Sequence, residues 1–431
     1  MTTSESYQNC LNEMFNLRRF GIKLGLDTIR QILDGLDNPQ EKFKTIHVAG
    51  TNGKGSVAAT LASILRSCGY KTGLYTSPHL VRFNERIVVD DQAIKDGDVL
   101  TAYRAIKKVT PGGREPTFFE CTTAMALHEF RRRKVQWAII ETGMGGRLDA
   151  TNIIRPKLSI ITNVSREHSE YLGSSIRQIA TEKAGIIKPA IPVVTGVKQK
   201  SAIEVIRTTA AAQKAPLYLK GKDFRARRTS KNTFNFIGPN TNWSGLKTAL
   251  AGQHQLDNTA LALAGYDILS SELEQITESC IKEGLRHTRW PGRLEKIIDE
   301  PLTILDGAHN LIAARTLAKY LKSHMTGRRI TLVVGILDDK PFRAMIAALV
   351  PICDRVIVTK PKIQRALPTE IIEKAAKEFT KQVEVISDVA RAVQVAIDSS
   401  APDDVVCIAG SLYVVGEAKA MLADQTQQET V

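Results

Sequence analysis

The sequence feature that most restricts the fold is a buried strand that leads through a glycine-rich loop into a helix. Residues 45–49 read as a buried strand, and apolar residues between 57 and 65 recur with the period of one helix face. A second apolar strand, 71–75, follows Gly69. A strand, a helix and a strand in this order predict a βαβ unit, which belongs to a parallel sheet covered by helices.

The same alternation continues to the end of the chain. Further buried strands are predicted at 135–140, 158–161, 191–194, 302–305, 330–334, 355–358, 383–386 and 405–408. Residues 216–250 break the rhythm with an alternating stretch and a Gly-Pro-Asn turn, which predicts a small β excursion. We therefore predict an α/β fold, with an N-terminal P-loop-type parallel-sheet ATPase domain over residues 1–298 and a smaller Rossmann-like domain over 299–431.

The glycine-rich loop has the composition of a phosphate-binding loop. Its residues are Gly50, Thr51, Asn52, Gly53, Lys54, Gly55 and Ser56. Backbone N–H groups at a helix N-terminus attract phosphate oxygens, and Lys54 adds a point charge. The match to the general P-loop pattern is incomplete, because Val48 occupies the first glycine position and Gly55 separates Lys54 from Ser56. The alternative is a tight glycine-rich turn without a ligand.

A carboxylate ends the predicted strand 135–140. Glu141 is followed by a second glycine-rich stretch, residues 142–150. An acidic side chain at the carboxyl end of a buried strand is placed to hold magnesium against nucleotide phosphates. The alternative is an acid that only caps the next loop.

Composition and charge narrow the class of protein. Lys and Arg number 59 against 45 Asp and Glu, a net charge of +14 that favours anionic partners. The first ten residues carry no apolar core and no run reaches membrane-spanning length, so we expect a cytoplasmic protein without a membrane partner. Six scattered cysteines form no CxxC pair, and we expect thiols rather than disulfides or a zinc site.

Several segments together carry a resemblance to a known family. They are Leu24-Gly25-Leu26, Gly50 to Ser56, Thr76 to Leu80, Glu85-Arg86-Ile87, Glu141 to Asn152, Glu182 to Ile186, Pro291-Gly292-Arg293, Asp306 to Asn310 and Gly410 to Tyr413. In this order and combination the chain resembles the folylpolyglutamate synthase and dihydrofolate synthase family, within the Mur ligase superfamily of ATP-dependent amide ligases. The resemblance covers most of the chain.

The resemblance implies a metal site and an unusual lysine. Ser77, Glu141 and His168 correspond to magnesium ligands around the ATP phosphates. Lys183 corresponds to a lysine that carbon dioxide converts into a carbamate, which binds a second magnesium ion. Two Mg²⁺ ions are therefore expected. From the residues alone, His168 reads as a loop histidine and Lys183 as a helix-surface residue.

The resemblance also assigns the three substrates. Asn258, Arg293 and Asp306 correspond to residues that hold ATP, the last two flanking the predicted domain boundary, so ATP is expected between domains. On sequence alone, Asp306 could be a turn-forming Asp-Gly pair. His309 and Ser411 are candidates for the glutamate side. The pterin-bearing substrate is assigned to Leu24, Gly25, Leu26, Asp27, Thr117, Phe119, Leu148, Asp149 and Ala150. Of Phe118 and Phe119, one is expected to lie in the core.

The implied activity is an ATP-dependent ligation of L-glutamate to a folate or dihydropteroate carboxylate through an acyl phosphate, with Lys54, Lys183 and His309 as catalytic candidates. We expect both the folylpolyglutamate and the dihydrofolate synthase activity in a monomer. One alternative is a Mur-type cell-wall ligase. Another is a nucleic-acid-binding P-loop ATPase, suggested by two basic clusters, 131–134 and 225–231. The sequence does not decide the preferred folate.

Overall fold

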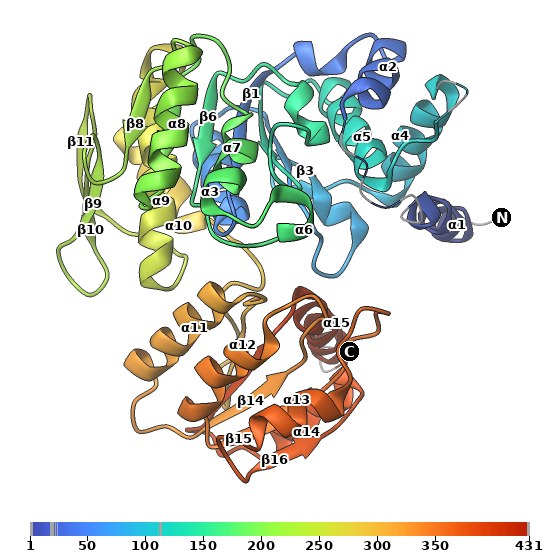
Figure 1. Cartoon of the computed structure of the whole chain (residues 1–431), viewed down its shortest axis with the longest axis vertical. Coiled ribbons are helices and arrows are strands. Elements are labelled where there is room, and N and C mark those ends of the chain that lie inside the picture. The colour runs from blue at the N-terminus through green and yellow to red at the C-terminus, as the bar shows by residue number, and fades with distance from the viewer. Residues whose placement is uncertain are drawn as a thin grey trace. The chain divides into compact units, whose positions relative to one another are not determined.

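Two units make up the computed structural model, which describes residues 3–17, 21, 23, 25–110, 112 and 114–428 (Figure 1). Unit 1 runs to His79 and adds Phe83–Ala249 and Gln255–Arg289, whereas unit 2 contains Leu80–Arg82, Leu250–His254 and the chain from Trp290. The division falls at Arg289, before the expected residue 298. The reason is that strand β12 (Glu295–Ile298) pairs antiparallel with β13 (Leu302–Leu305) and so joins the second sheet.

Unit 1 is built on an eight-stranded sheet in the order β4-β3-β2-β5-β1-β6-β7-β8. The strands are β1 (Lys44–Ala49), β2 (Thr72–Tyr75), β3 (Ile87–Val89), β4 (Gln92–Ala93), β5 (Trp137–Glu141), β6 (Leu158–Ile161), β7 (Val193–Thr195) and β8 (Leu217–Leu219). Neighbouring strands along β2-β5-β1-β6-β7-β8 pair in parallel, and β3 and β4 add an antiparallel edge beside β2. The predicted parallel sheet is confirmed.

Helices cover this sheet, and two apolar clusters fill the space between them. The helices are α1 (Thr3–Asn16), α2 (Asp27–Gly35), α3 (Lys54–Ser67), α4 (Asp96–Val109), α5 (Phe118–Arg132), α6 (Ser169–Leu172), α7 (Ile176–Ala184), α8 (Lys200–Ala212), α9 (Gln253–Ile268) and α10 (Glu278–His287). One cluster joins α1, α2, α4 and α5 to β2 and β5, and another joins α7 and α8 to β6 and β7. These clusters hold the helices against the sheet.

A separate three-stranded antiparallel sheet confirms the predicted β excursion. It contains β9 (Arg225–Arg228), β10 (Phe234–Ile237) and β11 (Asn242–Leu246), in the order β11-β10-β9, and stands at one side of unit 1 (Figure 1). Its aromatic residues Phe234, Phe236 and Trp243 are buried. The rings of Phe236 and Trp243 stack with centroids 5.3 Å apart, which gives this small sheet a core of its own.

Unit 2 is an α/β unit with the sheet order β12-β13-β17-β14-β15-β16. Its other strands are β14 (Ile330–Val334), β15 (Arg355–Val358), β16 (Val383–Val385) and β17 (Val405–Ala409), and its helices are α11 (Leu311–His324), α12 (Phe342–Leu349), α13 (Thr369–Ala376), α14 (Val389–Asp398) and α15 (Leu412–Gln428). Every pair except β12–β13 is parallel. The five strands predicted for this unit match β13 to β17, and the Rossmann-like arrangement is confirmed.

The expectation that all cysteines are thiols is wrong for one pair. Cys68, at the end of α3, forms a disulfide with Cys280 of α10, with Cα atoms 5.1 Å apart and a sequence separation of 212. The two helices pack closely here, since Ser63 Oγ donates a hydrogen bond to the Gly284 carbonyl at 2.8 Å. No local pattern reveals that contact. The remaining cysteines, Cys10, Cys121, Cys353 and Cys407, are thiols.

The described residues include no helix whose length and apolar character would let it cross a membrane.

Candidate nucleotide and ligation site

The glycine-rich segment 50–56 leads from β1 into the first turn of α3, as predicted, and two of its glycines are required by geometry. Gly53 caps α3 with a left-handed φ of 82°. Gly50 has a φ of 151°, and a β-carbon there would lie 1.9 Å from Thr162 Oγ1. Only glycine combines these backbone angles with such a close approach. The loop therefore presents bare backbone at the start of a helix, as anion binding requires.

Residues that follow β6 hold this loop in place. Thr51 N donates to the Asn163 carbonyl at 3.0 Å, and Asn52 N donates to Asn163 Oδ1 at 2.9 Å. Thr162 Oγ1 donates to the Asn52 carbonyl at 2.7 Å. Asn258, on α9, lies against Gly53, and its Nδ2 donates to Gln255 Oε1 at 2.9 Å. The loop is thus shaped before any ligand arrives.

The predicted acidic residue lies next to the predicted lysine. Glu141 ends β5 and is 4% exposed. Its Oε1 lies 3.8 Å from Lys54 Nζ, and its Oε2 accepts a hydrogen bond from Ser77 N at 3.4 Å. Ser77 follows β2, the strand beside β5, so two of the predicted magnesium ligands come from adjacent strand ends. Their oxygen atoms suit a hard cation.

Lys183 lies inside the protein and not on a helix surface. It is 3% exposed, and its Nζ donates a hydrogen bond to the Gly50 carbonyl at 2.9 Å. Burial, followed by repulsion from Lys54, lowers the pKa of the Lys183 amine to about 7. A neutral amine is therefore well populated at physiological pH, directly behind the phosphate loop.

The predicted ligand His168 is placed differently. It precedes α6, its side chain is exposed, and its backbone φ is 52°. Within the described part of the chain, no three His, Cys, Asp or Glu side chains gather as a metal-binding group. The ligand role of His168 stays a prediction.

The glycine-rich stretch after Glu141 folds back on α7. Arg147 donates from Nη2 to Glu182 Oε1 at 2.9 Å. A β-carbon at Gly185 would lie 2.3 Å from Arg147 Cβ, so glycine is needed where α7 meets this stretch. Asp149 is 6% exposed and accepts a hydrogen bond from Met144 N at 2.8 Å, and burial raises the pKa of its carboxyl group. Its neighbours Leu148 and Ala150 are half-buried and buried.

The segment at the start of α2 is only partly described. Leu24 lies outside the described residues. Gly25 adopts a φ of 149°, and Leu26 precedes the helix. Asp27 is its first residue, exposed and paired with Arg30 at 3.3 Å. Their assignment to a substrate stays a prediction.

The second predicted substrate segment begins α5. Thr117 is the N-cap, and its Oγ1 accepts a hydrogen bond from Glu120 N at 3.2 Å. Phe118 is buried and Phe119 half-buried, which confirms that one of the two belongs to the core. The Phe119 ring lies close against Gly143, in the stretch after Glu141. Thr117 therefore stabilises the first turn of α5.

The four candidates of unit 2 are arranged around two loops joined by a hydrogen bond from Gly307 N to the Gly292 carbonyl at 2.7 Å. Asp306 accepts from Leu294 N at 2.9 Å and from Ala308 N at 3.0 Å, and burial raises the pKa of its carboxyl group.

The other three candidates also have partners within unit 2. Arg293 Nη1 donates a hydrogen bond to the Gly292 carbonyl at 2.9 Å, and His309 Nδ1 lies 2.8 Å from the Gly307 carbonyl. Ser411 Oγ accepts a hydrogen bond from Val414 N at 3.2 Å and so caps the start of α15. The roles of Arg293, Asp306, His309 and Ser411 at ATP and glutamate stay predictions.

Comparison with known proteins gives the family. Residues 48–265 match the Mur ligase middle domain, and residues 292–412 match the Mur ligase glutamate ligase domain. A dihydrofolate synthase/folylpolyglutamate synthase of Bacillus subtilis is 35% identical over 430 residues, which cover 97% of this chain and 99% of that protein. The chain belongs to the folylpolyglutamate synthase and dihydrofolate synthase family.

Two solved structures of this family share the fold. E. coli FolC in complex with DHPP and ADP has a TM-score of 0.89 and 28% identity, covering 97% of this chain and 98% of that one. The bifunctional folylpolyglutamate synthase/dihydrofolate synthase of Yersinia pestis, complexed with AMPPNP and Mn ion, has a TM-score of 0.87 and 31% identity, covering 97% and 98%. The predicted Mur-ligase-like fold is confirmed.

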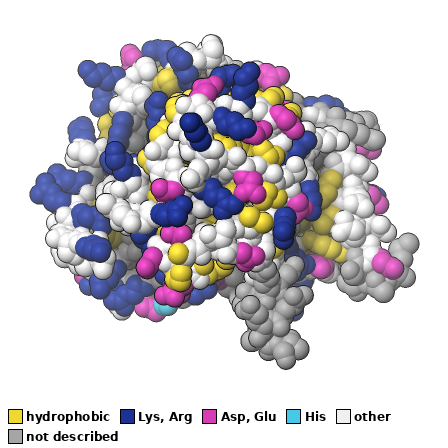
Figure 2. Space-filling model, turned by 90° about the horizontal axis from the view of Figure 1, so that it is seen from below, with side chains coloured by type: hydrophobic (Ala, Val, Ile, Leu, Met, Phe, Trp, Pro, Cys, Tyr) yellow, Lys and Arg dark blue, Asp and Glu magenta, His cyan; other side chains and the backbone are white. Residues whose placement is uncertain are grey.

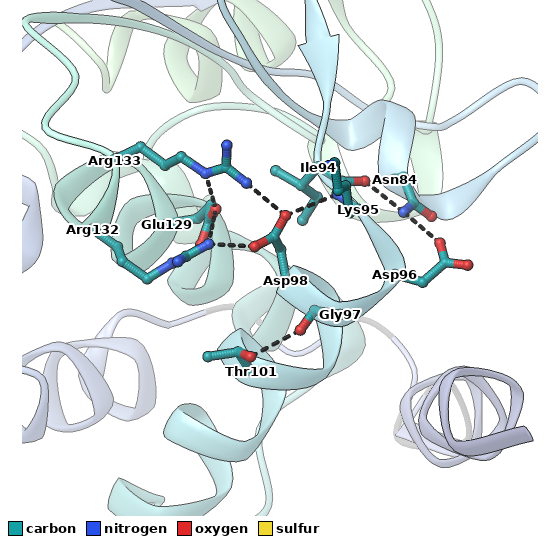
Figure 3. A network of polar contacts seen from close by, with 10 residues as sticks. All are labelled: Asn84, Ile94, Lys95, Asp96, Gly97, Asp98, Thr101, Glu129, Arg132 and Arg133. Carbon is teal, nitrogen blue, oxygen red and sulfur yellow. Dashed lines mark hydrogen bonds and ion pairs between the residues drawn. The ribbon is translucent and has the colours of Figure 1, made fainter. Parts of the chain in front are cut away.

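The first basic cluster is engaged in ion pairs of unit 1. Arg132 and Arg133 both bind Glu129 and Asp98, as Figure 3 shows, and the Glu129 side chain is fully buried. Arg131 pairs with Asp37 at 2.7 Å. Three of the four cations in 131–134 therefore neutralise acids of their own chain, which weakens the nucleic-acid alternative for this ligase family member.

The second basic cluster offers no stacking platform. Arg225, Arg227 and Arg228 lie exposed on β9, while the aromatic residues of that small sheet are buried. Lys and Arg side chains are scattered over the face seen in Figure 2, with Asp and Glu among them. Arginines along an edge strand also discourage pairing with another chain.

Sequence reasoning missed Thr162 and Asn163, which shape the phosphate loop. The signal was present, because both follow the buried strand β6, as Glu141 follows β5. Polar residues at the carboxyl end of a parallel strand face the usual ligand-binding edge of the sheet.

Proposed function

We propose that this chain is an ATP-dependent ligase that joins L-glutamate to the carboxylate of a folate or of dihydropteroate. The observation that carries the proposal is the set of charges at the phosphate loop, the half-buried Lys54 and the buried Glu141 and Lys183, in a chain that matches its relatives over nearly their full length. The E. coli structure with DHPP and ADP supports the class of substrates.

The reaction needs activation of a carboxylate. The ATP γ-phosphoryl group passes to the carboxylate oxygen and forms an acyl phosphate, with ADP leaving. The glutamate amine attacks the acyl carbon, the amide bond forms, and inorganic phosphate leaves as the amine loses a proton. Lys54 and the loop N–H groups neutralise the charge that moves toward ADP. This chemistry requires positioning and no nucleophilic serine or cysteine.

The metal would be held by oxygen ligands at adjacent strand ends. Glu141 and Ser77 provide a carboxylate and a hydroxyl, the donors that magnesium prefers, with His168 as the third proposed ligand. A bound divalent ion supplies charge neutralisation at the phosphates. The Yersinia pestis structure with AMPPNP and Mn ion supports a divalent metal. We propose Mg²⁺, with a second ion near Lys183.

The depressed pKa of Lys183, about 7, supports its proposed carbamylation. Its neutral nitrogen attacks the carbon of CO₂ and loses a proton, so that a neutral amine becomes an anionic carbamate. The carbamate nitrogen keeps one N–H, which can still donate to the Gly50 carbonyl. The change places negative charge beside the loop, where it can act as a metal ligand.

We propose the remaining roles by residue. Asn258, Arg293 and Asp306 bind ATP, whereas His309 and Ser411 serve glutamate. The pterin substrate is bound by Gly25, Leu26, Asp27, Thr117, Phe119, Leu148, Asp149 and Ala150. The chain acts as a cytoplasmic monomer on small molecules and carries both synthase activities.

A single assay separates these possibilities. Purified protein is incubated with ATP, Mg²⁺ and labelled glutamate, together with either dihydropteroate or a reduced folate monoglutamate. We expect ATP-dependent label in both products. Label with only one acceptor would reduce the proposal to one synthase activity. Label with neither, but with a nucleotide-linked cell-wall precursor supplied as a third acceptor, would favour the Mur-type alternative.

A further inference from the structure

A chain of buried hydrogen bonds runs from the central strand of unit 1 to Asp149. His47, in β1, is completely buried, and its Nε2 lies 2.9 Å from Thr151 Oγ1. Thr151 Oγ1 in turn binds Asp149 Oδ1, and Thr151 N donates to the same oxygen at 3.0 Å. The other carboxylate oxygen accepts from Met144 N. None of the assigned roles uses His47 or Thr151.

The direction of each hydrogen bond follows from the atoms. Met144 N, Thr151 N and the Thr151 hydroxyl all donate to the Asp149 carboxylate, and these hydrogen bonds oppose the rise in its pKa that burial causes. The Thr151 hydroxyl donates its only hydrogen to Asp149. His47 Nε2 must therefore carry a hydrogen and donate it to Thr151 Oγ1. Burial, followed by the charge of Lys188, lowers the pKa of His47 to about 3, so the imidazole is neutral.

A purely structural histidine would not be expected at this position. With Nε2 protonated, the neutral imidazole has Nδ1 as an acceptor, and this buried atom has no hydrogen-bond partner among the described residues. Leaving such a group unpaired costs roughly 1–3 kcal/mol. An apolar side chain in β1, like its neighbours Ile46 and Val48, would avoid that cost. We therefore attribute the presence of a histidine in this strand to the hydrogen bond that its Nε2 donates to Thr151 Oγ1.

We propose that His47 and Thr151 are positioning residues that fix the Asp149 carboxylate, and through it the Met144 amide, in the orientation that receives the pterin ring. This inference rests on the proposed function, in which Asp149 binds the pterin substrate. His47 itself is buried beneath the site and acts through Thr151. Because none of these four hydrogen bonds involves Lys54 or Glu141, we expect the ligation chemistry there to be unaffected.

Two matched pairs of variants test the proposal. Thr151→Val removes the hydroxyl at nearly constant volume, and Thr151→Ser keeps it. His47→Phe removes the Nε2 donor, and His47→Gln keeps an N–H of similar reach. We expect Thr151→Val and His47→Phe to raise KM for dihydropteroate about tenfold, with the KM values for ATP and glutamate within twofold of wild type. Thr151→Ser and His47→Gln should recover most of the loss.

A control and a double variant separate positioning from stability. Thr288→Val removes another buried hydroxyl, which donates to the Gly284 carbonyl at 2.8 Å, and should leave the KM for dihydropteroate unchanged. Because His47 acts through Thr151, the double variant His47→Phe/Thr151→Val should bind dihydropteroate no more weakly than Thr151→Val alone. Additive losses would overturn the proposal.

Other outcomes are equally decisive. If Thr151→Ser is as impaired as Thr151→Val, or if the KM values for all three substrates rise together, the two residues only support the fold and the inference fails. Direct titration of each variant with dihydropteroate, without ATP, gives the same comparison when turnover is lost. A wild-type protein that neither binds nor ligates dihydropteroate or folate would instead refute the proposed function.

Discussion

The two edges of the large sheet in unit 1 differ in how far their charged side chains are exposed to water. At the carboxyl-terminal edge, Glu141, Lys183 and Asp149 are nearly inaccessible to water and meet backbone groups of glycine-rich loops. At the amino-terminal edge, a hollow of about 720 Å³ opens among the residues that precede and begin β1, β5 and β6. There Lys44 and Lys157 each pair with Glu272 at 3.2 Å, and all three side chains remain partly exposed.

The difference teaches that burial of charge, and not the presence of a hollow, distinguishes the edge at which we propose that the reaction takes place. Water screens the ion pairs around Glu272, so they contribute little. Behind the phosphate loop, Lys183 is buried, and burial followed by repulsion from Lys54 lowers the pKa of its amine. Four predictions test this contrast, beginning with the largest expected effect.

Two lysines near opposite edges of the sheet provide the sharpest comparison, Lys44 at the start of β1 and Lys54 at the start of α3. Lys54→Ala should lower kcat/KM for ligation about a hundredfold or more, because it removes a cation that stabilises the migrating phosphate charge. Lys44→Ala, at the opposite edge, should stay within twofold of wild type. Steady-state kinetics of both variants, with circular dichroism to verify folding, makes the measurement. Similar activities for the two variants would remove the loop lysine from the mechanism.

The carbamate proposal predicts chemical rescue. Lys183→Ala should lose about a hundredfold in kcat, and added formate or acetate should restore part of it by supplying the missing carboxylate oxygens. Ligation rates across a carboxylate titration make the comparison. The same salts should not rescue Lys54→Ala, which lacks a cation. Full activity of Lys183→Ala in buffer freed of carbon dioxide would contradict the assignment.

The buried amine also predicts a pH dependence of stability. The folded-state pKa of Lys183 is about 7, against an ordinary value of 10.5, so the unfolded chain binds more protons between these pH values. The free energy of unfolding therefore rises with pH across that window, by about 2 kcal/mol from pH 7 to 9 for this group. Urea denaturation in buffer without carbon dioxide should show this rise in wild type and a smaller one in Lys183→Met. Identical slopes would mean that the amine is hydrated.

The smallest effect is expected at the amino-terminal edge. Glu272→Gln breaks both ion pairs, yet should cost only about 0.5 kcal/mol in the free energy of unfolding, and less at 1 M salt. Denaturation at low and high salt gives the value. A salt-independent loss of several kcal/mol would show that this edge is as shielded from water as the other, and the contrast would fail.

How much of the fold the sequence predicts depends on how each strand is buried. Strands such as β6 and β14 are buried along their whole length, and their continuous apolar runs reveal them. In contrast, β4 is exposed, β8 is only partly buried and β12 has no buried residue, so none leaves a clear apolar run. These edge strands were missed, and β12 moved the division between the units.

The candidate site divides in the same way. Lys54 and Glu141 could be predicted from local context, because Glu141 ends a strand before a glycine-rich turn and Lys54 follows such a turn at the start of a helix. The burial of Lys183 could not, since it depends on how α7 packs behind the loop, and only the family resemblance indicated this residue. Nor could the bond between Cys68 and Cys280 be predicted, because distant chain segments meet there.

The second unit is not encoded by one continuous stretch of sequence. Leu80–Arg82 and Leu250–His254 belong to it, and Leu80 packs against its apolar cluster, where a β-carbon on Gly416 would lie 2.1 Å from the Leu80 carbonyl oxygen. A gene fragment that begins at Trp290 therefore omits part of the interior it needs. Recombination between relatives would have to exchange three separate pieces, which makes this enzyme a poor source of interchangeable modules.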